Sequence, residues 1–183
     1  MKQNAAEALA KLKRGNEAYL KAGFNPGNVS PEIRLSTSKE GQEPYAVVIA
    51  CSDSRVLPEA VFSCGIGEIF TVRTAGNTVG ETELGSIEYA VEHLHVPLAV
   101  VLAHTSCGAV TAAVQGERGG YVGAITADIG KAAGEEKDVT KAAVANALYQ
   151  AEKIRSAFTD KYGLEVKAAL YHIHSGAVDW LIG

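Results

Sequence analysis

Two short segments of this sequence carry sulfur, nitrogen and carboxylate groups that could act together in one site. They are Ala50-Cys51-Ser52-Asp53-Ser54-Arg55 and Ala103-His104-Thr105-Ser106-Cys107-Gly108. Two thiolates and one imidazole suit Zn²⁺, which takes sulfur and nitrogen ligands in a tetrahedral arrangement. Three protein ligands leave a fourth position for water, which is typical of a catalytic zinc site. Cys51, His104 and Cys107 therefore predict a zinc ion that is available for chemistry.

The same residues also have simpler interpretations. A buried cysteine usually behaves as a small hydrophobic residue, and His-x-x-Cys alone is weak evidence for a metal. The metal is favoured because Cys, Asp and Arg crowd behind an apolar run, where polar groups seldom gather without a partner or a task. Asp53 and Arg55 could be a structural ion pair. Because the pair adjoins a proposed ligand, we favour a functional role for it. In this role Asp53 accepts a proton, and Arg55 keeps Asp53 ionised and away from the metal.

A sheet with parallel strands would bring the two segments together. Four apolar runs predict buried strands: Tyr45–Ala50, Ile69–Arg73, Leu98–Ala103 and Val166–Ile173. Helical spacing of apolar residues predicts helices over 4–20, 83–95 and 138–158, and another should begin after Ser106. This alternation predicts an α/β fold with a central, mostly parallel sheet of about four core strands flanked by helices. Both segments follow strands, so they should meet at the carboxyl edge of that sheet.

The chain should form one domain over residues 1–183, because its length suits a single compact unit. We expect residues 1–41 to form an N-terminal helical arm and connector. The connector, 21–41, contains glycine and proline and is expected to be irregular. The stretch 115–137 is rich in glycine and charge and indicates no particular element.

Composition limits the classes of function. The chain is 47% hydrophobic and 21% charged, as in ordinary soluble globular proteins. A net charge of −4 without a clustered basic patch argues against a nucleic-acid partner. The sequence has no apolar block long enough for a signal peptide or a bilayer span, so we expect a cytoplasmic protein without a membrane partner. Three cysteines, an odd number, argue against a disulfide framework.

At these motifs the sequence resembles the β-class carbonic anhydrases. The segment Cys51–Arg55 and the pattern His104-x-x-Cys107-Gly108 match that family's two signature segments, and Phe70–Asn77 and Gly85–Ala90 resemble further parts of it. Similarity runs from about Gln42 to the C-terminus and is thin across 115–160. The resemblance implies reversible hydration of CO₂ to bicarbonate and a proton by zinc-bound hydroxide. It also implies zinc ligation by the Cys, His, Cys set and a catalytic pair of Asp53 and Arg55.

The resemblance also implies a substrate pocket and an assembly. The side-chain amide of Gln42 would contact substrate, Phe70 and Tyr89 would line a small apolar pocket, and the backbone amide of Gly108 would donate to a substrate oxygen. Family members form homodimers or multiples of dimers, share the pocket across the interface and place an N-terminal helical arm on the neighbour. Relatives that close the site with the aspartate carry Trp and Gly where this chain has Val48 and Ala50. We therefore expect an open site with water on zinc at neutral pH.

Two other functions remain open from the sequence. The same fold and metal could hydrolyse carbonyl sulfide or carbon disulfide, depending on access to the pocket. Alternatively, the protein could be a zinc-stabilised binding or regulatory protein without turnover. Asp53, Arg55 and Gln42 argue against the second alternative, because a purely structural zinc would more naturally take a fourth protein ligand.

Overall fold

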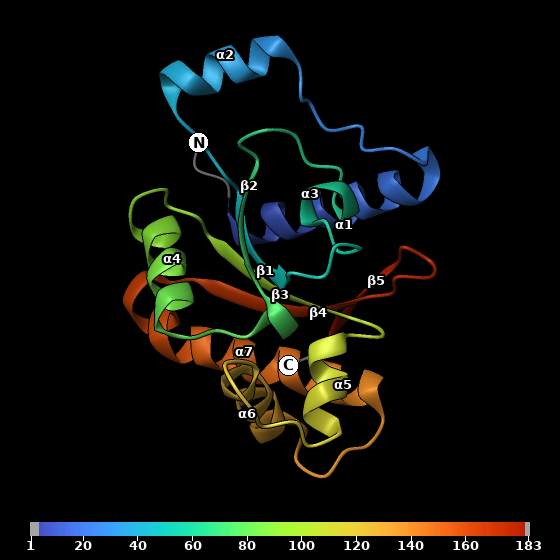
Figure 1. Cartoon of the computed structure of the whole chain (residues 1–183). Coiled ribbons are helices and arrows are strands. Elements are labelled where there is room, and N and C mark those ends of the chain that lie inside the picture. The colour runs from blue at the N-terminus through green and yellow to red at the C-terminus, as the bar shows by residue number, and fades with distance from the viewer. Residues whose placement is uncertain (1–3, 182–183) are drawn as a thin grey trace.

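A five-stranded sheet lies between two layers of helices in the computed structural model, which describes residues 4–181 (Figure 1). The strands are β1 Ala46–Cys51, β2 Ile69–Thr74, β3 Leu98–His104, β4 Glu165–Tyr171 and β5 Val178–Leu181, in the order β2-β1-β3-β4-β5. The first four are parallel, and β5 pairs antiparallel with β4. The predicted α/β fold is confirmed. β5 was not predicted, because it is only four residues long and none of its side chains is fully buried.

Helices cover both faces of the sheet. They are α1 Ala5–Ala22, α2 Pro31–Glu40, α3 Pro58–Val61, α4 Glu81–Glu92, α5 Gly108–Val114, α6 Val122–Ala133 and α7 Val139–Tyr162, with a short 3₁₀ turn over Ala75–Asn77. Residues of α1 and α3 pack with one face, whereas α4, α5, α6 and α7 pack with the other. β1 and β3 are buried along their whole length, as expected for central strands covered on both sides. Within residues 4–181, no helix combines the length and apolar character that crossing a bilayer requires.

Two segments differ from the sequence expectation. Part of the connector 21–41 forms α2, where the Ser30 side chain accepts the N–H of Ile33 and Pro31 occupies the first turn. None of the α2 residues is buried, so hydrophobic spacing gave no sign of the helix. The stretch 115–137 contains α6, whose buried residues are Gly123, Thr126 and Ile129, so only one of the three has a large apolar side chain.

The contact between α1 and the loop after α3 depends on one glycine. Gly15 lies inside α1, and a Cβ there would be 1.9 Å from the backbone oxygen of Phe62. This contact is with backbone, so no side-chain rotation can relieve it. Gly85 in α4 is also a glycine inside a helix, but a Cβ there would have no heavy atom within 4 Å.

We predict opposite effects for alanine at these two positions. Gly15→Ala should destabilise the fold by about 2 kcal/mol or more, because α1 must move away from the loop after α3. Gly85→Ala should stabilise it by about 0.5–1 kcal/mol, which is the ordinary gain from replacing a helical glycine. Urea unfolding of both variants measures the difference. A Gly15→Ala variant as stable as the wild type would contradict the packing of α1.

Candidate metal centre

The two sequence segments meet at the carboxyl ends of neighbouring strands. Cys51 ends β1, His104 ends β3, and Cys107 is the residue before the first turn of α5. The Sγ atoms of the two cysteines are 4.0 Å apart, and all three candidate ligand atoms lie within 4.8 Å of one another. A tetrahedral zinc ion with Zn–S bonds of about 2.3 Å places two sulfurs about 3.8 Å apart. The observed spacing therefore fits a single zinc ion.

One ring nitrogen of His104 is free to act as a ligand. Nδ1 is 2.9 Å from the backbone oxygen of Thr105, so Nδ1–H donates to that carbonyl. Nε2 is then the unprotonated nitrogen. Within the described residues it is buried without a hydrogen-bond partner. A buried acceptor in this position is costly unless something satisfies it, and a cation between the three ligand atoms would do so.

The surroundings of the two thiols favour the thiolate form of Cys51. Cys51 Sγ accepts the N–H groups of Gly76 at 3.2 Å and Asp53 at 3.4 Å. A hydrogen bond from the Cys107 thiol lowers the pKa of Cys51, although burial opposes this effect. The pKa of Cys107 is raised, because its thiol donates to Cys51 and is buried. A divalent cation binds both groups as thiolates and displaces that proton, which is ordinary zinc–cysteine chemistry.

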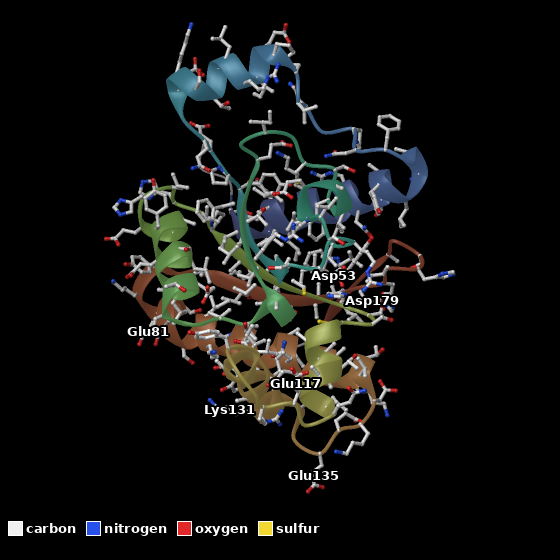
Figure 2. All side chains as sticks on the ribbon, viewed as in Figure 1. Asp53, Glu81, Glu117, Lys131, Glu135 and Asp179 are labelled. Carbon is white, nitrogen blue, oxygen red and sulfur yellow. The ribbon has the colours of Figure 1, made fainter. Side chains whose placement is uncertain are left out.

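Arg55 holds the carboxylate of Asp53 with two parallel hydrogen bonds. Arg55 Nε donates to Asp53 Oδ1 at 2.9 Å, and Nη2 donates to Oδ2 at 2.7 Å. This guanidinium keeps the pKa of Asp53 well below its usual range. Arg55 Nη2 also lies 3.4 Å from the backbone oxygen of Ser106, which joins the two segments. Asp53 lies at the end of the sheet above α5 in Figure 2. Its backbone N–H donates to Cys51 Sγ, whereas its carboxylate is not part of the three-ligand group.

Arg73 has a role that spacing in the sequence did not indicate. Its Nε donates to the backbone oxygen of Cys51 at 3.1 Å, and its Nη2 donates to that of Asp53 at 2.8 Å. Arg73 thus fixes the backbone turn between β1 and Arg55. Its two acceptors are main-chain carbonyls, which every residue has, so no residue type in the sequence marks the contact.

The predicted substrate residues divide into two groups. Gly108 is the first residue of α5 and directly follows Cys107. Gln42 lies four residues before β1, whereas Cys51 ends β1, so a strand length of about 17–20 Å separates Gln42 from the cluster. Phe70 contacts Tyr89 with ring centroids 6.2 Å apart, and it aligns with Val47 rather than with the end of β1. A single chain therefore does not bring Gln42, Phe70 and Tyr89 to the cysteine–histidine cluster.

Metal analysis of two cysteine variants tests the ligand set. The purified protein should contain about one zinc per chain, and Cys107→Ser should lose most of it. Cys64→Ser should keep its zinc, because Cys64 is a buried thiol whose Sγ lies 3.1 Å from the Tyr45 hydroxyl, outside the cluster. Elemental analysis of dialysed protein gives the ratio of zinc to chain. Full zinc in Cys107→Ser would mean that the ligands are wrongly assigned.

Comparison with known sequences identifies the chain's relatives. The model of the family described as carbonic anhydrase matches residues 46–178. Carbonic anhydrase 2 of Mycobacterium tuberculosis is 45% identical over 124 residues, which cover 65% of this chain and 59% of that protein. A carbonic anhydrase of Mycolicibacterium smegmatis is 49% identical over 110 residues, covering 60% of this chain and 52% of that protein. The chain thus spans only 52–59% of the length of these two relatives.

Solved structures give the same relationship. The β-carbonic anhydrase of Coccomyxa, determined in complex with acetazolamide, superposes with a TM-score of 0.72 at 26% identity, covering 84% of this chain and 78% of that one. A tetrameric β-carbonic anhydrase of the ascomycete Sordaria macrospora superposes with a TM-score of 0.71 at 25% identity, covering 96% of this chain and 94% of that one. The family match extends over more than half of the chain and includes all three candidate ligands. The chain belongs to the β-carbonic anhydrase family.

Proposed function

We propose that this protein catalyses the reversible hydration of CO₂ to bicarbonate and a proton, with one zinc ion held by Cys51, His104 and Cys107. The observation that carries the proposal is the group of three buried ligand atoms within 4.8 Å of one another. Asp53 stands beside this group and is bound by Arg55. Structural zinc sites are normally closed by a fourth protein ligand, and a three-ligand site leaves room for substrate chemistry.

Zinc bound here would act as a Lewis acid that makes water ionisable near neutral pH. Asp53 is ionised at neutral pH because Arg55 stabilises its carboxylate, so it can accept a hydrogen bond from a group beside the metal. Arg55 restrains both carboxylate oxygens and thereby keeps Asp53 from becoming a fourth ligand. The N–H of Gly108 belongs to the first turn of α5, where backbone donors are not used within the helix. It can therefore donate to an oxygen of the substrate.

We propose further that the working unit is a homodimer or a multiple of dimers. Gln42, Phe70 and Tyr89 lie away from the cluster of their own chain, and Tyr89 is 48% exposed. β2, which carries Phe70, is an edge strand of the described sheet. Helix α2 stands apart from the sheet (Figure 1) and has no buried residue, as expected for an arm that packs on a neighbouring subunit. In such an assembly these three side chains would complete the partner's pocket.

We propose a cytoplasmic location, because the zinc site needs cysteines in the reduced form. Cys51, Cys64 and Cys107 are all free and buried. Thiols stay reduced in the cytoplasm, whereas an oxidising compartment favours disulfides. The two cysteines of the candidate metal centre must remain reduced to bind zinc.

Removal of the Asp53 carboxylate tests the catalytic proposal. Asp53→Ala should retain about one zinc per chain and lose CO₂ hydration by about 100-fold or more, because the hydrogen-bond acceptor beside the metal is gone. Stopped-flow hydration at pH 8.5 with a pH indicator measures the rate. Asp160→Asn is the matched control and should keep full activity, since Asp160 is exposed near the C-terminal end of α7.

Two results would contradict the catalytic proposal. A wild-type protein that contains full zinc and does not hydrate CO₂ would favour a binding or regulatory protein. If that same protein hydrolysed carbonyl sulfide or carbon disulfide, the fold and metal would stand and the substrate would change.

A mixed dimer tests the shared pocket. Gln42→Ala should lower kcat/KM about 100-fold through loss of a donor to substrate, and Cys107→Ser should be inactive through loss of zinc. Co-expression of the two variants with different tags, followed by purification through both tags, isolates the mixed dimer. If Gln42 completes the site of the partner subunit, the mixed dimer contains one intact site, made of zinc on the Gln42→Ala chain and Gln42 of the Cys107→Ser chain. The mixed dimer should then have about half of the wild-type activity. A mixed dimer as inactive as its parents would place Gln42 in its own chain's site.

A further inference from the structure

The 75–79 loop, between β2 and α4, brings a backbone donor to one candidate ligand. The N–H of Gly76 donates to Cys51 Sγ at 3.2 Å. Gly76 is buried and has φ +67°, in the left-handed region that favours glycine. A Cβ at this position would be 2.6 Å from Ile129 Cδ1 and 3.1 Å from Ala109 Cβ. The loop can therefore approach the sulfur this closely because residue 76 has no side chain.

Two amide side chains of α7 hydrogen-bond to the backbone of this loop. Asn146 Nδ2 donates to the backbone oxygen of Gly76 at 2.8 Å, so it binds the same residue that donates to the sulfur. Gln150 Oε1 accepts the N–H of Val79 at 3.1 Å, at the far end of the loop. Gln150 Nε2 also donates to Asn146 Oδ1 at 3.0 Å. One turn of α7 separates the two amides, so they lie on one face and reach both ends of the loop.

A charged pair completes the network. Gln150 Nε2 donates to Asp128 Oδ2 of α6 at 2.8 Å, and Lys153 donates to the same oxygen at 3.1 Å. Lys153 also donates to the backbone oxygen of Val79. The loop is thus bound at Gly76 and Val79 by residues of α7, and α6 holds those residues in turn. Three of these hydrogen bonds join α7 to the loop, two join α7 to α6, and one joins the two amides within α7.

The burial of these amides needs an explanation beyond packing. Asn146 and Gln150 are both 0% exposed, whereas their buried neighbours on α7 are mainly alanines, such as Ala143, Ala147 and Ala151. A buried amide is costly unless its donors and acceptors are all paired, and apolar residues would fill this position without that cost. What the two amides provide is a fixed orientation of the main chain on both sides of the Gly76 Cα. The carbonyl of Gly76 points to Asn146 and its N–H points to Cys51.

We propose that Asn146 and Gln150 are positioning residues of the metal centre, which hold the 75–79 loop so that the Gly76 N–H donates to Cys51 Sγ when metal is bound. The inference rests on the metal site of the proposed function but not on its reaction. An N–H bond to a thiolate stabilises the anion and fixes the direction of its remaining lone pairs. Partners of this kind are often worth 10- to 100-fold in metal affinity.

Cadmium-113 NMR observes the proposed contact directly. The full-length protein loaded with ¹¹³Cd²⁺ should show scalar coupling between the Gly76 amide proton and the metal, transmitted through the N–H···S hydrogen bond. In Asn146→Ala this coupling should be lost, and the dissociation constant for Cd²⁺, measured by competition with a chelator, should rise about 10-fold or more. Gln150→Ala should weaken both signals to a smaller extent, because it frees only the far end of the loop.

Asn16→Ala is the matched control. Asn16 is a buried amide that makes three hydrogen bonds, to the backbone oxygens of Val61 and Gly176 and from the N–H of Val178, and it contacts no candidate ligand. Its loss should cost comparable stability and leave the Gly76 coupling and the Cd²⁺ affinity unchanged. An Asn146→Ala protein that behaves like Asn16→Ala in both measurements would overturn the proposal.

The wild type alone keeps the proposal falsifiable if Asn146→Ala does not fold. Cadmium bound without coupling to the Gly76 proton would overturn the positioning role and leave the metal site intact. A wild type that binds no cadmium or zinc would overturn the metal site and the positioning role together. A metal-loaded protein that shows the coupling but hydrates no CO₂ would support the positioning role and refute the proposed reaction alone.

Discussion

The candidate site depends on two parallel strands that end side by side. β1 and β3 are neighbours in the sheet, and their register aligns Ala50 with Leu102. Cys51 and His104 therefore end adjacent strands at one edge of the sheet, although 52 residues lie between them in the chain. The turn into α5 then returns Cys107 to the same place. No local motif could assemble these three side chains, because the crossover between the strands sets their distance.

The three converging side chains are buried, so a bound cation would satisfy them better than water. The three candidate ligands are at most 4% exposed, so water cannot readily satisfy them. Backbone donors from Asp53 and Gly76 and the fixed tautomer of His104 prepare the group for a cation. Around it, two arginines have separate tasks: Arg73 holds the main chain, and Arg55 holds a carboxylate. The surrounding contacts thus direct the three candidate metal ligands at one point and keep the Asp53 carboxylate away from it.

Residue types and strand ends were enough to predict the centre of the site. The apolar runs that became β1 and β3 are clear because both faces of these strands are buried. Cys51 and His104 are the last residues of these two strands. The supporting contacts could not be predicted in this way. Arg73 and Asn146 bind backbone carbonyls, so their partners have no signature in the sequence. Helix α2 escaped prediction for a related reason: it has no buried face to produce a periodic pattern.

The proposed metal centre requires that sulfur, nitrogen and sulfur hold one zinc ion and leave one position for a small ligand. X-ray absorption spectroscopy of the zinc-loaded protein at the zinc edge tests this requirement most directly. We expect two sulfur atoms at about 2.3 Å and two lighter atoms, a histidine nitrogen and a water oxygen, at about 2.0–2.1 Å from the zinc. A first shell with no sulfur, or one filled by four protein ligands, would contradict it.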